Sequence, residues 1–277
     1  MNTPVKVEQP RFRPVVDDPS PFQDSERVVY EKTPLDLVIC QLRFPPILKI
    51  SSEAPARFQD KLRSDYPLYR EPAPLALGVG LPRDISSIIE GMLPLPSVKA
   101  HEFLSEDEQW VVTLTHESLA LTCKNYSRWE DFRSHLQSAL DLLVEIYRPP
   151  FFTRVGLRYR DLIRRSLLGL REVPWVELLS RDLAGELHSR IGPHIEGLGR
   201  QIVVGLQDGR AKVTIQHGFA KKDGEICYII DSDFYATDRT ESQDAMAILN
   251  YFNRQSGRLF RWTISQRLHD AMEPRAV

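Results

Sequence analysis

The feature that most constrains this chain is a plan of strand, helix, β-hairpin and long helix that occurs twice along the sequence. The first copy spans about residues 35–147 and the second about residues 152–260, with low identity between them. Two such β-α-β-β-α pseudo-repeats predict an α+β fold, in which a curved, largely antiparallel sheet carries long helices on one face and leaves the other face open. A chance match between two stretches of an ordinary α+β chain is the alternative.

The first copy has clear local signals. Residues 35–44 alternate in hydrophobicity, which indicates a strand, and residues 110–124 have the pattern of a β-hairpin. A long helix is expected over residues 128–147, with apolar residues spaced three and four apart. Ser127 precedes Glu130 by three residues, which is the spacing of a capping box at the start of this helix.

The second copy repeats these signals in the same order. Its expected elements are a strand at 152–161, a helix at 175–187, strands at 201–206, 212–217 and 225–233, and a helix at 241–260. Thr240 is the predicted cap of that last helix, and Ser265 is expected to start a short C-terminal helix over residues 265–272.

The chain divides into an arm and one domain. Residues 1–27 contain five prolines and little apolar periodicity, which predicts a flexible or loosely docked arm. This arm is either an unneeded tail or a segment that binds a partner. Residues 28–277 are expected to form a single domain, because each copy leaves an apolar sheet face that the other copy's sheet continues.

The composition excludes some classes of protein. The net charge of −2 removes the broad attraction on which non-specific nucleic-acid binders rely. No apolar run approaches the roughly 18 residues that cross a bilayer, and the N-terminus lacks the apolar core of a signal peptide, so a cytoplasmic location is expected. The cysteines Cys40, Cys123 and Cys227 lie in apolar segments without CxxC spacing, which predicts buried, reduced thiols.

Common catalytic and cofactor motifs are missing from the sequence. The seven histidines are dispersed, and His188 and His194 share a loop without a rigid element to fix ligands, so no metal site is expected. Gly78 and Gly80 form a lone GxG in a proline-rich segment, so no nucleotide cofactor is expected. There is no GxSxG elbow, and no catalytic residue is assigned.

An arginine-rich strand is the strongest candidate for a site. Alternation places Arg154, Gly156, Arg158 and Arg160 on one face, and the carboxylates of Asp231 and Asp233 share a face of another strand. Three interpretations stay open: a structural Arg–Asp ladder between strands, a polar cleft for an anionic or zwitterionic ligand, or plain solvent exposure. The candidate ligand-binding residues are Arg43, Arg158, Arg160, Asp231 and Asp233, and the residues expected beside them are Gln41, Thr113 and Thr122.

Several local strings resemble a "sporadically distributed" protein family of bacteria and archaea that has no functional name. The strings are PLDLVICQLRF, YSRWEDF, RVGLRYRDLI, IIDSDFY and LFRWTISQRL, and the resemblance covers roughly residues 30–272. It implies a fold plan and no activity, and the patchy occurrence of such a family suits mobile-element, toxin–antitoxin or defence contexts. The repeated topology is also similar to the effector-binding domains of gyrase-inhibitor-like regulators.

These observations lead to three hypotheses about function. The first is a non-enzymatic binding or interaction protein with a regulatory or defence role, which takes a small anionic ligand or a protein partner on its open sheet face or its arm. The second is an enzyme with arginine anchors and an Asp231 or Asp233 base. The third is single-stranded nucleic-acid binding, which requires exposed aromatic rings beside the arginines. The aromatic residues at strand-to-helix junctions are expected to fill the core, and an exposed pair among them would form a stacking platform; they are Tyr126, Trp129, Phe234, Tyr235 and Trp262.

Overall fold

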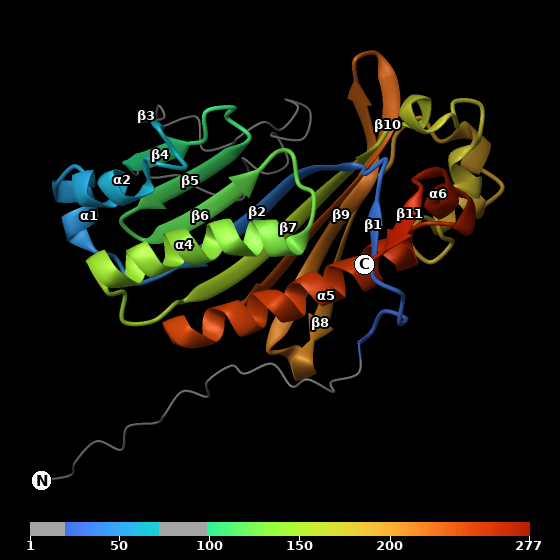
Figure 1. Cartoon of the computed structure of the whole chain (residues 1–277). Helices are drawn as coiled ribbons and strands as arrows, with labels where there is room; N and C mark the ends of the chain where they lie inside the picture. Colours follow the sequence, from blue (N-terminus) through green and yellow to red (C-terminus); the bar gives the residue numbers. More distant parts are fainter. Residues whose placement is uncertain (1–19, 72–98) are drawn as a thin grey trace, which may run out of the picture.

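The computed structural model describes residues 20–71 and 99–277, and in these residues the chain is an α+β protein built on one large antiparallel sheet (Figure 1). All neighbouring strands of this nine-stranded sheet run antiparallel. From one edge to the other the order is β3 (Leu68–Arg70), β4 (Ala100–Leu104), β5 (Trp110–Thr115), β6 (Ser118–Cys123), β2 (Leu35–Arg43), β7 (Arg154–Ile163), β10 (Glu225–Ala236), β9 (Ala211–Lys222) and β8 (Gly199–Leu206).

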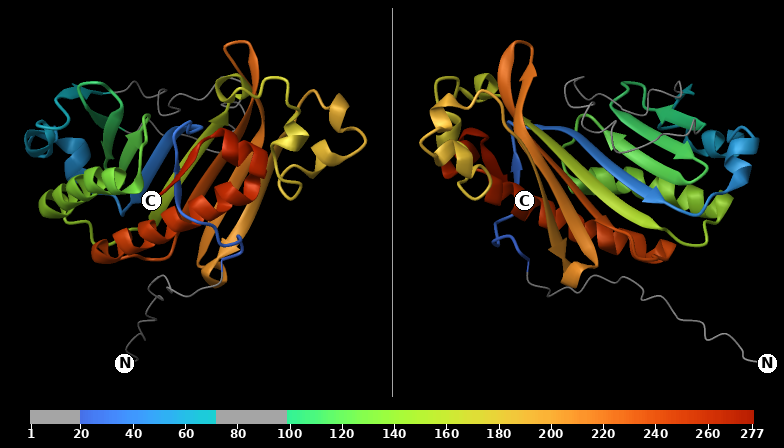
Figure 2. Two further views of the ribbon diagram at one scale, coloured as in Figure 1. Left: turned by 45° about the vertical axis from the view of Figure 1, so that its right-hand side comes forward. Right: turned by 180° about the vertical axis from the view of Figure 1, so that it is seen from behind.

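Two long helices, α4 (Trp129–Tyr147) and α5 (Ala245–Thr263), lie on one face of the sheet (Figure 1). The shorter helices are α1 (Leu48–Ser52), α2 (Ala56–Leu62), which packs on α4, and α6 (Gln266–Ala271). Seen from behind in Figure 2, the opposite face carries none of the helices that the described residues form. We call this the open face.

The core lies between the sheet and the long helices. In β2 the alternate residues Val38, Cys40 and Leu42 are fully buried, as the sequence pattern predicts. One continuous cluster of buried apolar residues joins both halves of the chain.

The predicted burial of the three cysteines is confirmed: all are buried and free. No helix of the described residues is long and apolar enough to span a membrane.

The two halves share only part of their element order. After strand β2 the first half continues with α1, α2, β3, β4, β5, β6 and α4, whereas after β7 the second half continues with short 3₁₀ turns, β8, β9, β10 and α5. The hairpins at β5–β6 and β9–β10 stand where the sequence predicts them. That the two halves arose by duplication stays a prediction.

The predicted helix at 175–187 is wrong. In the middle of this segment, Leu179 forms a strand-like bridge with Ile264, and the Ser180 amide donates to the Thr263 carbonyl at 2.9 Å. These bonds to the end of α5 occupy backbone groups that a continuous helix would use internally. The chain instead forms short 3₁₀ turns between β7 and β8: η1 (Arg165–Leu168), η2 (Trp175–Glu177), η3 (Gly185–His188) and η4 (Gly192–His194).

The predicted capping box of α4 is also wrong. The N-cap is Arg128, which makes no side-chain capping bond. The Ser127 hydroxyl donates to the Asp131 carboxylate at 2.9 Å, and Glu130 accepts two hydrogen bonds from Arg27. The Ser127 and Glu130 side chains thus bind charged side chains instead of the free backbone amides at the start of α4.

The caps of the last two helices differ. Thr240 does not cap α5: its backbone exchanges hydrogen bonds with Phe152, and α5 begins at Ala245 after a 3₁₀ turn, η6 (Ser242–Asp244). The predicted cap at Ser265 is confirmed, because its hydroxyl accepts from the Leu268 amide at 3.2 Å.

Part of the predicted arm lies on α5. Phe22 is buried with its ring 5.8 Å from that of Trp262, and Ser20 donates to the Gln255 side chain at 2.5 Å. The chain then forms β1 (Val28–Tyr30), which pairs with β11 (Pro274–Ala276). Residues 1–19 and the GxG of Gly78 and Gly80 lie outside the described residues.

Candidate functional site

Strand register assigns the predicted arginines and aspartates to the open face. Residues directly opposite each other in an antiparallel pair point to the same side of the sheet. Arg158 lies opposite Ile39 of β2 and Asp233 of β10, and Arg160 lies opposite Asp231. Since Arg158 alternates with the buried Leu157 and Tyr159, it points away from the long helices.

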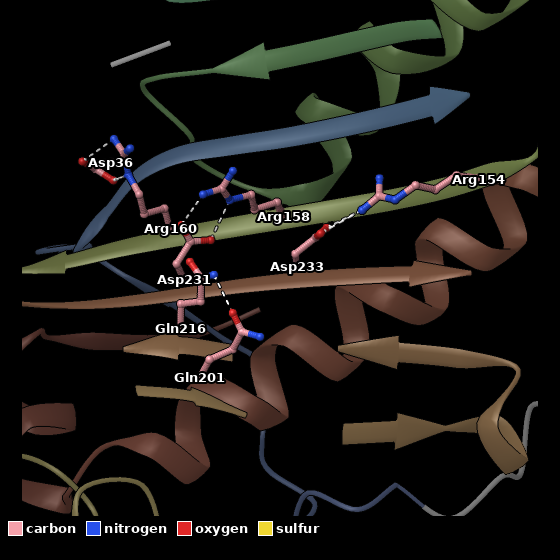
Figure 3. Close-up of polar contacts among 8 residues, drawn as sticks. All are labelled: Asp36, Arg154, Arg158, Arg160, Gln201, Gln216, Asp231 and Asp233. Atoms are coloured by element: carbon pink, nitrogen blue, oxygen red, sulfur yellow. Dashed lines mark hydrogen bonds and ion pairs between the residues drawn. The ribbon is translucent and has the colours of Figure 1, made fainter. Parts of the chain in front are cut away.

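Arg158 pairs with Asp231 diagonally across the two strands (Figure 3). Its Nε donates to Asp231 Oδ1 at 2.7 Å and its Nη2 donates to Oδ2 at 2.5 Å. This bidentate geometry is the strongest arrangement of these two side chains. Sequence alternation predicted that Arg158 would pair with Asp231 or Asp233, and the pair with Asp231 forms.

Arg160 binds a carboxylate that the sequence pattern did not indicate. Its Nε and Nη2 each donate to Asp36 at 2.9 Å (Figure 3). Strict alternation along β2 assigns Asp36 to the helix side with Val38. However, the register shifts between Leu35 and Leu37, and this irregularity turns Asp36 toward Arg160. An isolated aspartate at the start of an apolar strand was the only available signal.

Arg154 completes the ladder with Asp233. Its Nη2 donates to both carboxylate oxygens at 2.9 and 2.8 Å, and its Nη1 donates to Gln41 Oε1 at 3.3 Å. To reach them, the side chain passes over Gly156, where an added Cβ would lie 2.1 Å from Nη1. The guanidinium carbon also lies 5.2 Å from the ring centroid of Tyr235.

We call the pairs Arg154–Asp233, Arg158–Asp231 and Arg160–Asp36 the ladder. They bring three positive and three negative charges together, so the ladder is neutral as a unit. Burial raises the pKa of Asp233, and the neighbouring Arg154 only partly offsets this. For Arg158, burial opposes the charge, but the hydrogen bond and charge of Asp231 prevail and raise the pKa.

Polar, partly exposed residues continue the open face on both sides of the ladder. Thr122 lies opposite Ile39, in the row of Arg158, and Thr113 lies opposite Ala120 in the next row, as predicted. On the other side, Gln216 donates to Gln201 at 2.9 Å (Figure 3).

Arg43 does not join the ladder. It lies opposite Arg154 at the end of β2, and its guanidinium donates to Glu117 at 3.0 Å instead. The positive charge of Arg154 repels the Arg43 guanidinium, and the Glu117 carboxylate attracts it, so the side chain turns away from the ladder. Four of the five candidate residues therefore lie together, and Arg43 stands apart from them.

Of the five aromatic candidates for a stacking platform, only Tyr235 lies on the open face. Trp129 and Phe234 are buried on the helix side. Tyr126 packs against Phe132, and Trp262 packs against Phe22 of the N-terminal segment. A row of exposed rings beside the arginines is therefore missing from the described residues.

Two cavities lie away from the ladder. One of about 480 Å³ lies between the N-terminal segment and the end of α5, and its lining includes Glu26, Arg261 and His269. The other, of about 390 Å³, is lined by residues that include Glu186 and Arg200. Across residues 20–71 and 99–277, no three His, Cys, Asp or Glu side chains gather closely enough to hold a metal ion.

Comparison with known proteins leaves the family open. No protein-family model matches the chain, and no curated protein matches it. Among solved structures, the duplicated taurocyamine kinase from Schistosoma mansoni, with bound transition state analog components, is similar at 10% identity and a TM-score of 0.31. The match covers 87% of this chain and 34% of the kinase chain, so this chain spans about a third of that protein. A likeness at this TM-score says nothing about activity.

Proposed function

We propose that this protein is a non-enzymatic interaction protein that binds a protein partner on its open sheet face. The observation that carries the proposal is the ladder: each of its three guanidinium groups already holds both oxygens of a carboxylate, Arg158 and Arg160 through two nitrogens and Arg154 through Nη2. The face is polar and internally neutralised, and side chains such as Gln41, Thr122 and Thr214 remain partly exposed on it. Such a surface suits a partner that adds hydrogen bonds at many points.

The ladder disfavours the small-anion alternative. An anion that binds Arg158 through its Nε–Nη2 edge has to displace the Asp231 carboxylate, which is fixed in the same sheet. Breaking a partly buried pair leaves a charge without its partner, which is costly. A protein partner needs no such exchange, because it can bind the ladder as a neutral unit together with its polar surroundings.

The ladder also disfavours the enzyme alternative. A general base needs a free lone pair directed at the substrate. Asp231 accepts two hydrogen bonds from Arg158, and Asp233 accepts two from Arg154. Both oxygens of each carboxylate thus already accept a hydrogen bond from the arginines that were expected to anchor a substrate. We also propose a cytoplasmic location, and a regulatory or defence setting that the family resemblance suits.

Partner capture with matched variants tests the proposal. One bait carries Thr122→Arg and Thr214→Arg, which add bulk and charge on either side of Arg158 within one row of the open face. The control bait carries Ser134→Arg and Ser138→Arg on the exposed side of α4. A partner that wild type and the control retain but the open-face variant loses supports the proposal. A partner that the control loses and the open-face variant retains overturns it.

A thermal-shift series addresses the small-anion alternative. Wild type and Arg158→Leu are compared in phosphate and in citrate, with chloride at matched ionic strength. The proposal predicts equal small shifts for both proteins. A stabilisation by phosphate or citrate that Arg158→Leu abolishes favours an anion site at the ladder instead.

A further inference from the structure

The edge strand β8 exposes backbone groups that can pair with another strand. Strand β8 ends the nine-stranded order, and within the described chain β9 is its one hydrogen-bonded neighbour. Its sequence is GRQIVVGL, with Ile202, Val203 and Val204 at its centre. Val203, in the middle of this strand, is 53% exposed.

The hydrogen-bond pattern shows which backbone groups of β8 face outward. The Phe219 amide donates to the Leu198 carbonyl, a bond that flanks the opposed glycines Gly199 and Gly218. That pair is therefore of the non-hydrogen-bonded type, and the two types alternate along an antiparallel ladder. It follows that the even-numbered residues of β8 bond to β9. The N–H and C=O groups of the odd-numbered residues point away from the sheet; these are Gln201, Val203 and Gly205.

This edge lacks the devices that keep other sheet edges from pairing. Such edges are commonly short, carry proline or lysine, or are interrupted by a bulge. The opposite edge, β3, has three residues and ends in Arg70. Strand β8 has eight residues in continuous register with β9 and contains neither proline nor lysine. Its one charge, Arg200, is paired with Glu186 of the same chain.

We propose that β8 pairs antiparallel with β8 of a second copy of this chain, with Val203 opposite Val203. The outward N–H and C=O groups of Val203 then exchange both hydrogen bonds with their counterparts. In this register Ile202 lies opposite Val204, Gln201 lies opposite Gly205, and the two Arg200 side chains lie far apart. In this register the apolar centre of the strand pairs with itself and the one charged residue, Arg200, meets no like charge, which is the reason to choose a second copy over a foreign strand.

The pairing would join the two open faces into one continuous surface. It is independent of the partner proposed for the open face, because it uses only the backbone edge of β8. Failure of the pairing would leave the open-face proposal standing. Thr122 lies on β6, away from β8, whereas Thr214 lies on β9 directly opposite Val203, so Thr122→Arg alone keeps the two proposals distinguishable.

A single cysteine at position 203 provides a direct test. The native cysteines Cys40, Cys123 and Cys227 are fully buried. The thiol that Val203→Cys introduces is therefore the one in the described chain that an oxidant can reach. Hydrogen-bonded antiparallel partners have Cα atoms about 5.5 Å apart, within the range that a disulfide spans. Mild oxidation should convert most of this variant to a covalent dimer. Ile226→Cys, at another exposed apolar position on β10, should stay mostly monomeric.

Sedimentation across a concentration series completes the test. Wild type should be a dimer that dissociates on dilution. Val203→Pro should be monomeric and still folded, because the outward N–H of Val203 has no partner within the described chain. Val203→Lys is the second variant, in case proline disturbs the strand. A monomeric wild type, or a dimer that persists in both variants, overturns the proposal. Equal cross-linking at positions 203 and 226 overturns it as well.

Discussion

The guanidinium of Arg154 lies over the backbone of Gly156, in the space that a side chain at position 156 would fill. This crossing lets Arg154 reach Asp233 and Gln41 along the open face. The glycine is thus needed for the space that it leaves free, and its backbone conformation plays no part. The absence of a side chain at Gly156 therefore allows the Arg154 guanidinium to lie beside Asp233.

Gly156→Ala should move Arg154 away from Asp233. The alanine favours the strand, but the loss of a charge-assisted pair outweighs this gain, so the net loss of unfolding free energy is about 1 kcal/mol. The carboxyl pKa of Asp233, which Arg154 lowers, should rise further, and this is measurable by NMR titration. The same substitution in an Arg154→Ala background should cost nothing. An equal cost in both backgrounds would mean that Gly156 acts through something other than Arg154.

Arg158→Leu should destabilise the protein by about 2 kcal/mol, less than the 3–5 typical of a fully buried pair because the arginine is partly exposed. The cause is the Asp231 carboxylate, which is 8% exposed and loses its two donors. Adding Asp231→Asn removes that charge and should recover part of the loss in chemical denaturation. A double variant that is less stable than Arg158→Leu alone would contradict the pairing.

Leu140→Ala should destabilise the fold by about 2–5 kcal/mol, since it removes a buried side chain from the core-facing stripe of α4 and leaves a cavity. Ser138→Ala, on the exposed side of the same helix, is the control and should change stability by less than about 0.5 kcal/mol. Denaturation curves give both values. Equal effects of the two substitutions would show that α4 does not pack as described.

The pH dependence of stability should contain a contribution from His217. This side chain is 3% exposed and its Nδ1 lies 2.7 Å from the Tyr228 hydroxyl. Burial, with a smaller contribution from Arg200, lowers its pKa to about 4. An unfolded histidine titrates near 6.5, so between these values the unfolded chain binds a proton that the folded chain does not. Stability should therefore fall as the pH falls through this window, by at most about 1.4 kcal/mol per pH unit.

His217→Asn isolates this contribution, because asparagine does not titrate and keeps a polar atom near the position of Nδ1. Wild type should lose more stability than the variant between pH 6.5 and pH 4, and the two curves should run parallel above pH 7. Parallel curves over the whole range would mean that His217 is not held neutral by its surroundings.

The open face was predictable in part from local patterns. Alternation on β7 and β10 placed Arg158 and Asp231 on matching faces, because a regular strand has a fixed period of two. Asp36 escaped prediction, because a register shift in β2 reversed its side. The crossing of Arg154 over Gly156 also escaped, since it depends on three neighbouring strands and not on sequence spacing.

Tertiary contacts explain the remaining errors. The segment around Leu179 reads as a helix, yet its backbone bonds to the end of α5, which local propensity cannot anticipate. The edge position of β8 was equally hidden, because strand order is decided by the whole sheet. Hairpins and the stripe of α4 were predicted well, since short-range patterns determine them.

The central claim is that the open face binds a protein partner, and the most direct test is the dissociation constant of a purified partner by calorimetry. With Thr122→Arg and Thr214→Arg the account predicts at least about tenfold weaker binding, equal to about 1.4 kcal/mol. The control with Ser134→Arg and Ser138→Arg on α4 should bind as wild type does. Wild-type affinity in the open-face variant, with a loss in the α4 variant, would contradict the account.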